Sequence, residues 1–130
     1  MVKKAFVISI ADAGHETEAD YFGLVSGHDT DKLAKTGMKN HKSDNVDAPI
    51  IDDFAVSLEC RLKDTVDVGS HMMVIGEIVN ISADEKVLDE KGKIDIKKLR
   101  PIIYDITGND YYNVGDKAGD AFKDGLKYKD

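Results

Sequence analysis

The sequence contains one cysteine, two prolines and no tryptophan among its 130 residues. A single cysteine excludes a disulfide within the chain and suits a reducing compartment, so we expect a cytoplasmic protein. No apolar run approaches the roughly 18 residues that a membrane-spanning helix needs. The N-terminal stretch is basic and then apolar, but it is short and leads into Asp12 rather than a small-residue cleavage site. We therefore do not interpret it as a signal peptide.

Positive charge is also scarce, because the net charge is −7 and the basic residues are scattered along the chain. A protein that follows a nucleic-acid backbone needs a basic surface, so we expect no nucleic-acid partner. Hydrophobic residues make up 42% and charged residues 33% of the chain, which is typical of a globular protein. This length favours one domain over residues 1–130.

Motifs for metal, nucleophilic and nucleotide chemistry are missing as well. Four histidines share no spacing that would place two ligands on one face, so we expect no metal site: His15, His28, His41 and His71. There is no Gly-x-Ser-x-Gly elbow, Gly-x-Gly-x-x-Gly turn or Walker motif. Cys60 alternates with Leu58 and Leu62 on a predicted core face, and we interpret it as an inert, buried thiol.

What remains is a pattern of strands with short helices between them. Strands are predicted over 3–10, 56–62, 65–68, 72–82 and 102–106. Helices are predicted over 17–25, 31–36, 96–99 and, weakly, 116–127. Residues 38–53 and 84–93 are predicted to be surface connections. This order indicates a mostly β fold with α additions, built as a small, mostly antiparallel barrel.

Four of these elements carry more specific expectations. The strand over 3–10 is apolar on both faces and is predicted to lie inside the sheet, as is the long apolar strand over 72–82. A capping box of Thr17 and Asp20 is predicted to start the first helix, which Gly27 would stop. Alternation predicts that four side chains of one strand point inward: Val56, Leu58, Cys60 and Leu62. Gly76 marks a bulge or a close approach.

Polar residues stand at the ends of three predicted elements. Ser26 and Gly27 form a turn before a helix, where free backbone N–H groups and the Lys32 cation could meet an anion. The alternative is that this turn only caps the helix and that Lys32 lies in solvent. His71 begins a strand and Tyr104 follows two isoleucines; each could contact a ligand or be an ordinary strand residue.

Taken in order, several motifs of the chain resemble the flavoredoxin group of the flavin reductase-like family. The resemblance runs through Ala-Asp-Tyr-Phe-Gly-Leu-Val-Ser-Gly at 19–27, Gly-Ser-His at 69–71 and Arg-Pro-Ile-Ile-Tyr at 100–104, and it covers nearly the whole chain. It implies an FMN-binding split β-barrel. Residues 3–10 match a strand well inside the family's domain, so the resemblance implies the C-terminal two-thirds of that domain, incomplete at its N-terminal side.

The resemblance also implies a function and a site. FMN would be bound in a homodimer, and the chain would be an FMN-dependent oxidoreductase that acts in electron transfer or in NAD(P)H-linked flavin reduction. A protein electron donor could replace NAD(P)H. Lys32 would contact an anionic or carbonyl group of FMN, His71 would help to hold it, and Tyr104 would contact the ring system. Ser26 and Gly27 would belong to the same site.

Two alternatives remain open at this point. The segments that normally supply an Asn, a Trp and a Thr near the cofactor have no counterpart here, and missing barrel strands leave bare edges. The chain would then be a flavin-less relative that acts as a dimeric interaction module. A small-ligand binding protein of another type is the remaining alternative.

Overall fold

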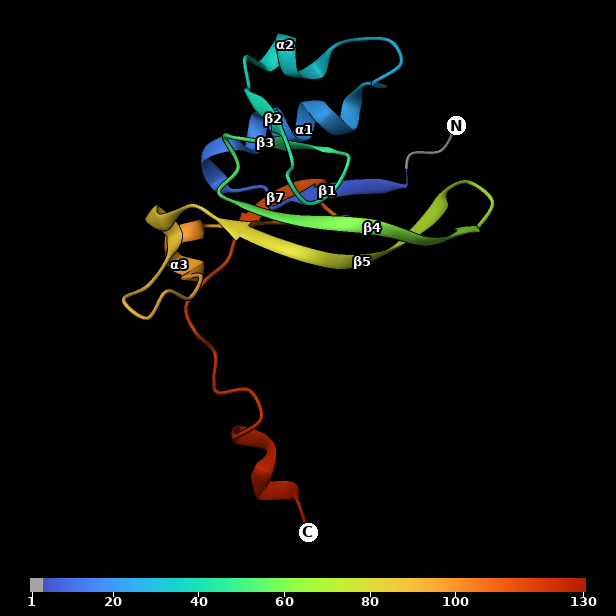
Figure 1. Ribbon diagram of the computed structural model, residues 1–130. Coiled ribbons are helices and arrows are strands. Elements are labelled where there is room, and N and C mark those ends of the chain that lie inside the picture. The colour runs from blue at the N-terminus through green and yellow to red at the C-terminus, as the bar shows by residue number, and fades with distance from the viewer. Residues whose placement is uncertain (1–3) are drawn as a thin grey trace.

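The computed structural model describes residues 4–130 (Figure 1). Its strands are β1 (Ala5–Ser9), β2 (Asn40–Lys42), β3 (Pro49–Ile51), β4 (Val56–Asp67), β5 (Met72–Ala83), β6 (Ile102–Asp105) and β7 (Asp110–Asn113). The α-helices are α1 (Glu16–Leu24), α2 (Lys32–Thr36) and α3 (Ile96–Leu99). Short 3-10 turns are η1 (Ala13–His15), η2 (Glu85–Val87) and η3 (Asp124–Tyr128). No helix within 4–130 is long and apolar enough to cross a membrane.

The central sheet has three antiparallel strands in the order β1-β4-β5. Two hairpins, β2–β3 and β6–β7, form separate small sheets. In Figure 1, α1, α2 and the β2–β3 hairpin lie above the central sheet, and the C-terminal segment descends below it. Over residues 4–130 the sheet does not close, which confirms a mostly β fold with an incomplete barrel.

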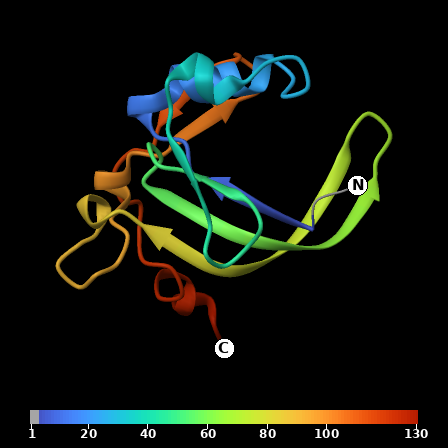
Figure 2. The same ribbon diagram turned by 45° about the horizontal axis from the view of Figure 1, so that its top comes forward.

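The apolar core lies where β4 begins and β5 ends. Its buried members, from β4, η2, α3 and the residue before β4, are Ala55, Val56, Val87 and Leu99. Ile10, Leu58 and Ala83 pack against this cluster and are partly buried. The core joins one end of the sheet to η2 and α3, and the far end of β4 and β5 extends beyond it (Figure 2). This cluster therefore stabilises one half of the sheet far more than the other.

A carboxylate is buried on the face of β4 that is opposite the apolar core. Glu59 is 1% exposed and accepts hydrogen bonds from the Ser43 hydroxyl and the Asn80 amide. The Asn45 amide also donates to both carboxylate oxygens, at 3.3 and 3.4 Å. The hydrogen bond from Ser43, followed by that from Asn80, holds the pKa of Glu59 below its usual value, although burial opposes this shift. Glu59 therefore fixes the loop between β2 and β3 onto the sheet.

Gly76 lies under an aromatic ring. A Cβ atom built at this position would be 2.4 Å from Cζ of Phe6 and 3.2 Å from Cβ of Cys60. Gly76 pairs with Leu62, next to the irregular register between Leu62 and Asp64. The predicted close approach at this glycine is therefore confirmed, with the Phe6 side chain as the neighbour.

Three expectations about strands are wrong. The predicted interior strand at 3–10 is an edge strand, β1, over its described part; both its faces are apolar because β3 and the Phe6–Gly76 contact cover them. Position 3 lies outside the described residues. β5 is mostly exposed rather than core, because β4 is its one partner in the described sheet. Residues 38–53 contain the β2–β3 hairpin, and Met38, Ser43 and Ala48 are buried there.

Three local expectations are also wrong. Asp12 caps η1, and α1 begins at Glu16 without a side-chain cap, so Thr17 and Asp20 form no capping box. The helix ends at Leu24, before Gly27. At the C-terminus, the 3-10 turn η3 over Asp124–Tyr128 takes the place of the predicted helix over 116–127, because two glycines weaken a helix whose residues are exposed.

Replacing Glu59 should destabilise the chain and change its response to acid. We expect Glu59→Gln to lower the free energy of unfolding by about 2–4 kcal/mol at pH 7, because an amide cannot accept from every donor around it. Because the pKa is lowered in the folded state, the extra free energy of unfolding that Glu59 gives the wild type is present above the ordinary value of 4.5. It is lost as pH falls through the folded-state pKa. Urea unfolding of both proteins from pH 7 to pH 3 measures this difference, and a constant difference would contradict it.

Gly76→Ala should also destabilise the chain. The new methyl group would overlap the Phe6 ring, and we expect a loss of about 1–3 kcal/mol. Gly23→Ala is the matched control, because no atom lies within 4 Å of its Cβ position in α1, where alanine favours helix. The midpoint temperatures of thermal unfolding of the two variants should therefore shift in opposite directions from the wild type. Equal shifts would count against the close approach.

Candidate functional site

A cavity of about 400 Å³ lies between β1, the end of α1, α2 and β3. Its walls are mainly apolar, and among the described residues that line it Lys32 alone carries a charge. The lining residues are Ala5, Phe6, Val7, Ser9, Phe22, Lys32, Leu33, Ala48, Pro49 and Ile51. An apolar cavity with one cation at its wall suits a flat ring that carries a carbonyl or anionic group.

Local capping places Lys32 at this cavity. The Asp31 carboxylate accepts from the backbone N–H of Ala34 at 3.1 Å, which starts α2, and Gly37 ends it with φ +70°. The Lys32 ammonium donates to the carbonyl oxygen of Phe22 at 2.6 Å and so joins α2 to the last turn of α1. An ammonium has three N–H donors, and this bond uses one of them. Lys32 is therefore held by the protein rather than lying free in solvent.

The turn before α2 is largely occupied by its own hydrogen bonds. The Ser26 hydroxyl accepts from the N–H of His28 at 3.2 Å, and the Ser26 carbonyl accepts from the N–H of Asp29, also at 3.2 Å. Gly27 lies beside Lys32 and lines a second, shallow hollow with it. Asp29 and Asp31 also line that hollow, and their carboxylates would repel an anion there. The structure therefore brings Gly27 and Lys32 together and engages Ser26 in the turn.

His71 and Tyr104 lie on other elements. His71 is exposed at the end of the β4–β5 hairpin, and its Nδ1 lies 2.8 Å from the Ser70 hydroxyl. In both ribbon views this end projects away from α2 (Figures 1 and 2). Tyr104 of β6 is 52% exposed and donates to the Asn109 side chain at 2.7 Å. Neither residue lines the Lys32 cavity within one chain, and the roles assigned to both stay predictions.

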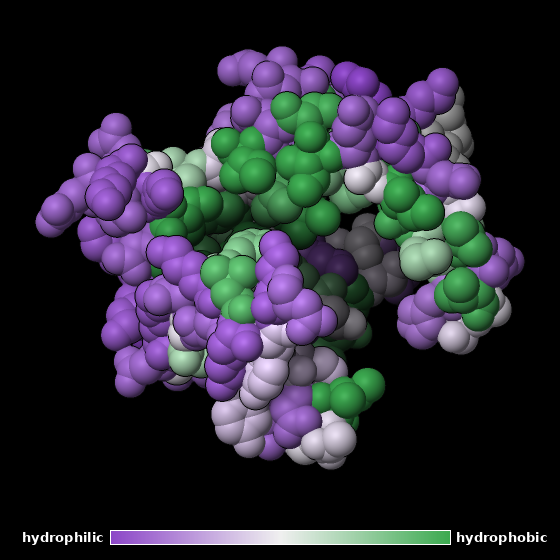
Figure 3. Space-filling model, turned by 90° about the horizontal axis from the view of Figure 1, so that it is seen from below, coloured by the Kyte–Doolittle hydropathy of each residue, from purple (hydrophilic) through white to green (hydrophobic). Residues whose placement is uncertain are grey.

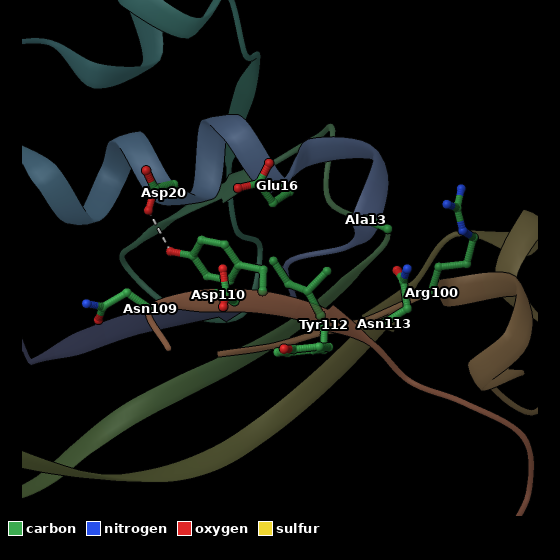
Figure 4. Close-up of a pocket in the computed structure, with 10 residues that line it drawn as sticks. Ala13, Glu16, Asp20, Arg100, Asn109, Asp110, Tyr112 and Asn113 are labelled. Carbon is green, nitrogen blue, oxygen red and sulfur yellow. Dashed lines mark hydrogen bonds between the residues drawn. The ribbon is translucent and has the colours of Figure 1, made fainter. Parts of the chain in front are cut away.

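Another cavity, of about 560 Å³, lies between α1 and the β6–β7 hairpin (Figure 4). Three carboxylates, of Glu16, Asp20 and Asp110, line it together with Arg100. The Tyr111 hydroxyl donates to Asp20 at 2.7 Å, and this bond raises the pKa of Tyr111. No sequence motif pointed to this pair, since the two residues are 91 positions apart. The bond holds α1, and with it Phe22, against the hairpin.

Comparisons with known proteins identify the family of this chain. The family described as "Flavin reductase like domain" matches residues 1–108 of the chain. The chain belongs to this family. The flavoredoxin of Desulfovibrio vulgaris (Miyazaki F) is 35% identical and superposes with a TM-score of 0.88 over 95% of this chain and 66% of its own. The flavoredoxin of Methanosarcina acetivorans is 32% identical, with a TM-score of 0.87 over 97% of this chain and 66% of its own.

The match to curated relatives is shorter. An uncharacterized protein of Archaeoglobus fulgidus is 31% identical over 75 residues, which is 58% of this chain and 42% of the relative. The chain thus spans 66% of the flavoredoxin chains and less than half of this relative. The predicted flavin reductase-like family and the flavoredoxin likeness are confirmed.

The contribution of the hydrogen bond between Tyr111 and Asp20 to stability should be measurable on its own. We expect Tyr111→Phe to lower the free energy of unfolding by about 1 kcal/mol, since it removes a hydrogen bond to a partly buried carboxylate. Tyr112→Phe is the control, because the neighbouring ring is 56% exposed. Urea unfolding should separate the two variants, and equal stabilities would argue against a contribution from this bond.

Proposed function

We propose that this chain binds FMN at the Lys32 cavity and takes part in electron transfer or flavin reduction. The single observation that carries the proposal is an apolar cavity with one fixed ammonium in a member of the flavin reductase-like family. When bound, the flavin would supply the electron or hydride chemistry. NAD(P)H or a protein electron donor would be the reductant.

The residues present fit the ring part of FMN. A volume of about 400 Å³ lies within the range of small-molecule sites, roughly 300–1,000 Å³. Phe22 offers aromatic surface, and Val7 and Leu33 offer apolar surface, to a planar ring. The remaining N–H donors of Lys32 would hold a carbonyl or anionic oxygen of the flavin and orient the ring against β1.

The phosphate of FMN needs more than one lysine. Its double negative charge is best met by several donors. Asp29 and Asp31 lie at the N-terminal end of α2, where their carboxylates would repel it. We therefore keep the expected homodimer as part of this proposal. His71 and Tyr104 are exposed in one chain, which leaves them able to contact a flavin bound between two copies.

A second candidate is a flavin-free interaction module. The uncovered lower face of the β1-β4-β5 sheet favours it, because exposed apolar surface marks an association site. The two candidates differ in one measurable property, which is the affinity for FMN.

An FMN titration tests the proposal. Wild-type protein should quench FMN fluorescence and saturate at one FMN per chain. Lys32→Met should weaken binding at least tenfold, because the charge at the cavity is lost while the length of the side chain is kept. Lys35→Met is the matched control, since Lys35 is exposed on the same helix outside the cavity lining, and we expect its affinity to stay within twofold of the wild type.

Circular dichroism and thermal unfolding should be measured on both variants, because Lys32 also bonds to α1. Folded wild-type protein that leaves FMN fluorescence unchanged at 1 mM protein would overturn the flavin proposal and favour the interaction module. Equal weakening by both substitutions would mean that the Lys32 cavity is not the site.

A further inference from the structure

Residues 114–130 form a C-terminal arm that leaves the body of the molecule beside α3. Every residue of the arm is exposed, and in both ribbon views the arm lies on the lower side of the central sheet (Figures 1 and 2). An ion pair of 3.0 Å between Lys97 of α3 and Asp116 joins the start of the arm to the body. The match to the family ends at residue 108, before the arm begins, so the family does not account for it.

The arm carries three large apolar side chains that nothing in the described chain covers. Phe122, Leu126 and Tyr128 are 99%, 56% and 80% exposed. A turn of the arm is held by its own hydrogen bonds, because the N–H of Asp124 donates to the carbonyl of Asp120 at 3.1 Å. Phe122 has φ +62°, which a bulky side chain rarely adopts. An exposed ring on a strained backbone gains free energy when it moves onto an apolar surface.

The lower face of the sheet offers such a surface on the same side of the molecule. Ile8, Ile78 and Ile81 are 45%, 51% and 54% exposed. The antiparallel register places them on one face, because Ile8 and Ile81 both pair with Leu58, and Ile78 pairs with Cys60. Seen from below, apolar side chains surround a hollow on this side of the molecule, the lower hollow (Figure 3).

The apolar core connects the lower hollow to the start of the arm. Leu58 packs against the buried cluster that contains Leu99 of α3, so α3 lies at one end of this face. Ile81 is two residues along β5 from the part of the strand that packs on the cluster, a step of about 7 Å. Phe122 is six residues from Asp116, and six extended residues span up to about 20 Å. The arm can therefore reach the lower hollow while Asp116 stays at α3.

We propose that the C-terminal arm folds back as a strap and docks in the lower hollow of its own chain, with Phe122 against Ile81. The arm contains four lysines and four aspartates, so its side-chain charges cancel and apolar contact decides where it docks. Its own chain is the nearest acceptor, because a tether of a few residues gives an effective concentration on the order of millimolar.

The surface area of the molecule supports a closing strap. The chain exposes 10,080 Å², whereas a compact chain of 14.3 kDa exposes about 6,800 Å². The uncovered arm and the uncovered lower hollow both add to this excess, and docking would remove apolar surface of both from water. The inference does not rest on flavin binding, because the Lys32 cavity lies on the other side of the sheet.

A single tryptophan in the arm tests the docking, since the chain contains none of its own. In Phe122→Trp, acrylamide should quench the fluorescence at least threefold less than that of N-acetyltryptophanamide, because the docked ring is covered. Adding Ile81→Asp should restore strong quenching. Ile106→Asp is the matched control, since Ile106 is 77% exposed in the turn between β6 and β7, and it should leave the quenching unchanged.

Strong quenching of Phe122→Trp itself, or equal effects of the two aspartates, would overturn the proposal. Circular dichroism checks that each variant is folded. Leu126→Asp is a second variant that leaves the sheet intact, and it should also restore strong quenching. If Ile81→Asp fails to fold, Ile81→Ser replaces it.

A mixing experiment separates docking on the same chain from docking on a second copy. The Phe122→Trp chain is unfolded in urea and refolded with a tenfold excess of the Ile81→Asp chain, which has no tryptophan. Docking within one chain predicts that the weak quenching of the reporter is kept. A rise to the value of the exposed ring would show that the arm docks on another copy and would overturn the proposal.

Discussion

The buried Glu59 carboxylate is the interaction on which the upper half of this molecule depends. Its acceptor oxygens bind donors from the loop between β2 and β3 and from β5, so one side chain of β4 joins three segments. The three hydrogen-bond donors are neutral, and their hydrogen bonds offset the cost of burying a negative charge. The same loop ends at Ala48 and Pro49, which form a wall of the Lys32 cavity. The shape of the candidate flavin site therefore depends on a carboxylate that does not line it.

The Lys32 cavity depends on contacts between distant segments as well. Lys32 is held by the end of α1, and α1 is held by the bond between Tyr111 and Asp20. The cavity thus lies where β1, both helices and the β2–β3 hairpin meet. None of these elements could form it alone, since α2 has only five residues and β1 is equally short.

The lower face of the sheet contrasts with this upper layer. The buried core is small and lies at one end of the sheet, whereas β5 exposes an apolar edge and face. The layer above the sheet and this lower face are therefore different surfaces of the molecule.

The sequence by itself determined the family, the mostly β fold, a short helix near 31–36 that ends at Gly37, and the close approach at Gly76. These features are predictable because they follow from motifs, from local capping or from the lack of a side chain. Only the tertiary structure decided that Glu59 is buried, that Asp20 meets Tyr111, that β5 is exposed and that Lys32 is separated from His71 within one chain. Alternation along a strand assigns each side chain to one face of a sheet, but it cannot tell which segment covers that face. That depends on contacts between residues far apart in the sequence.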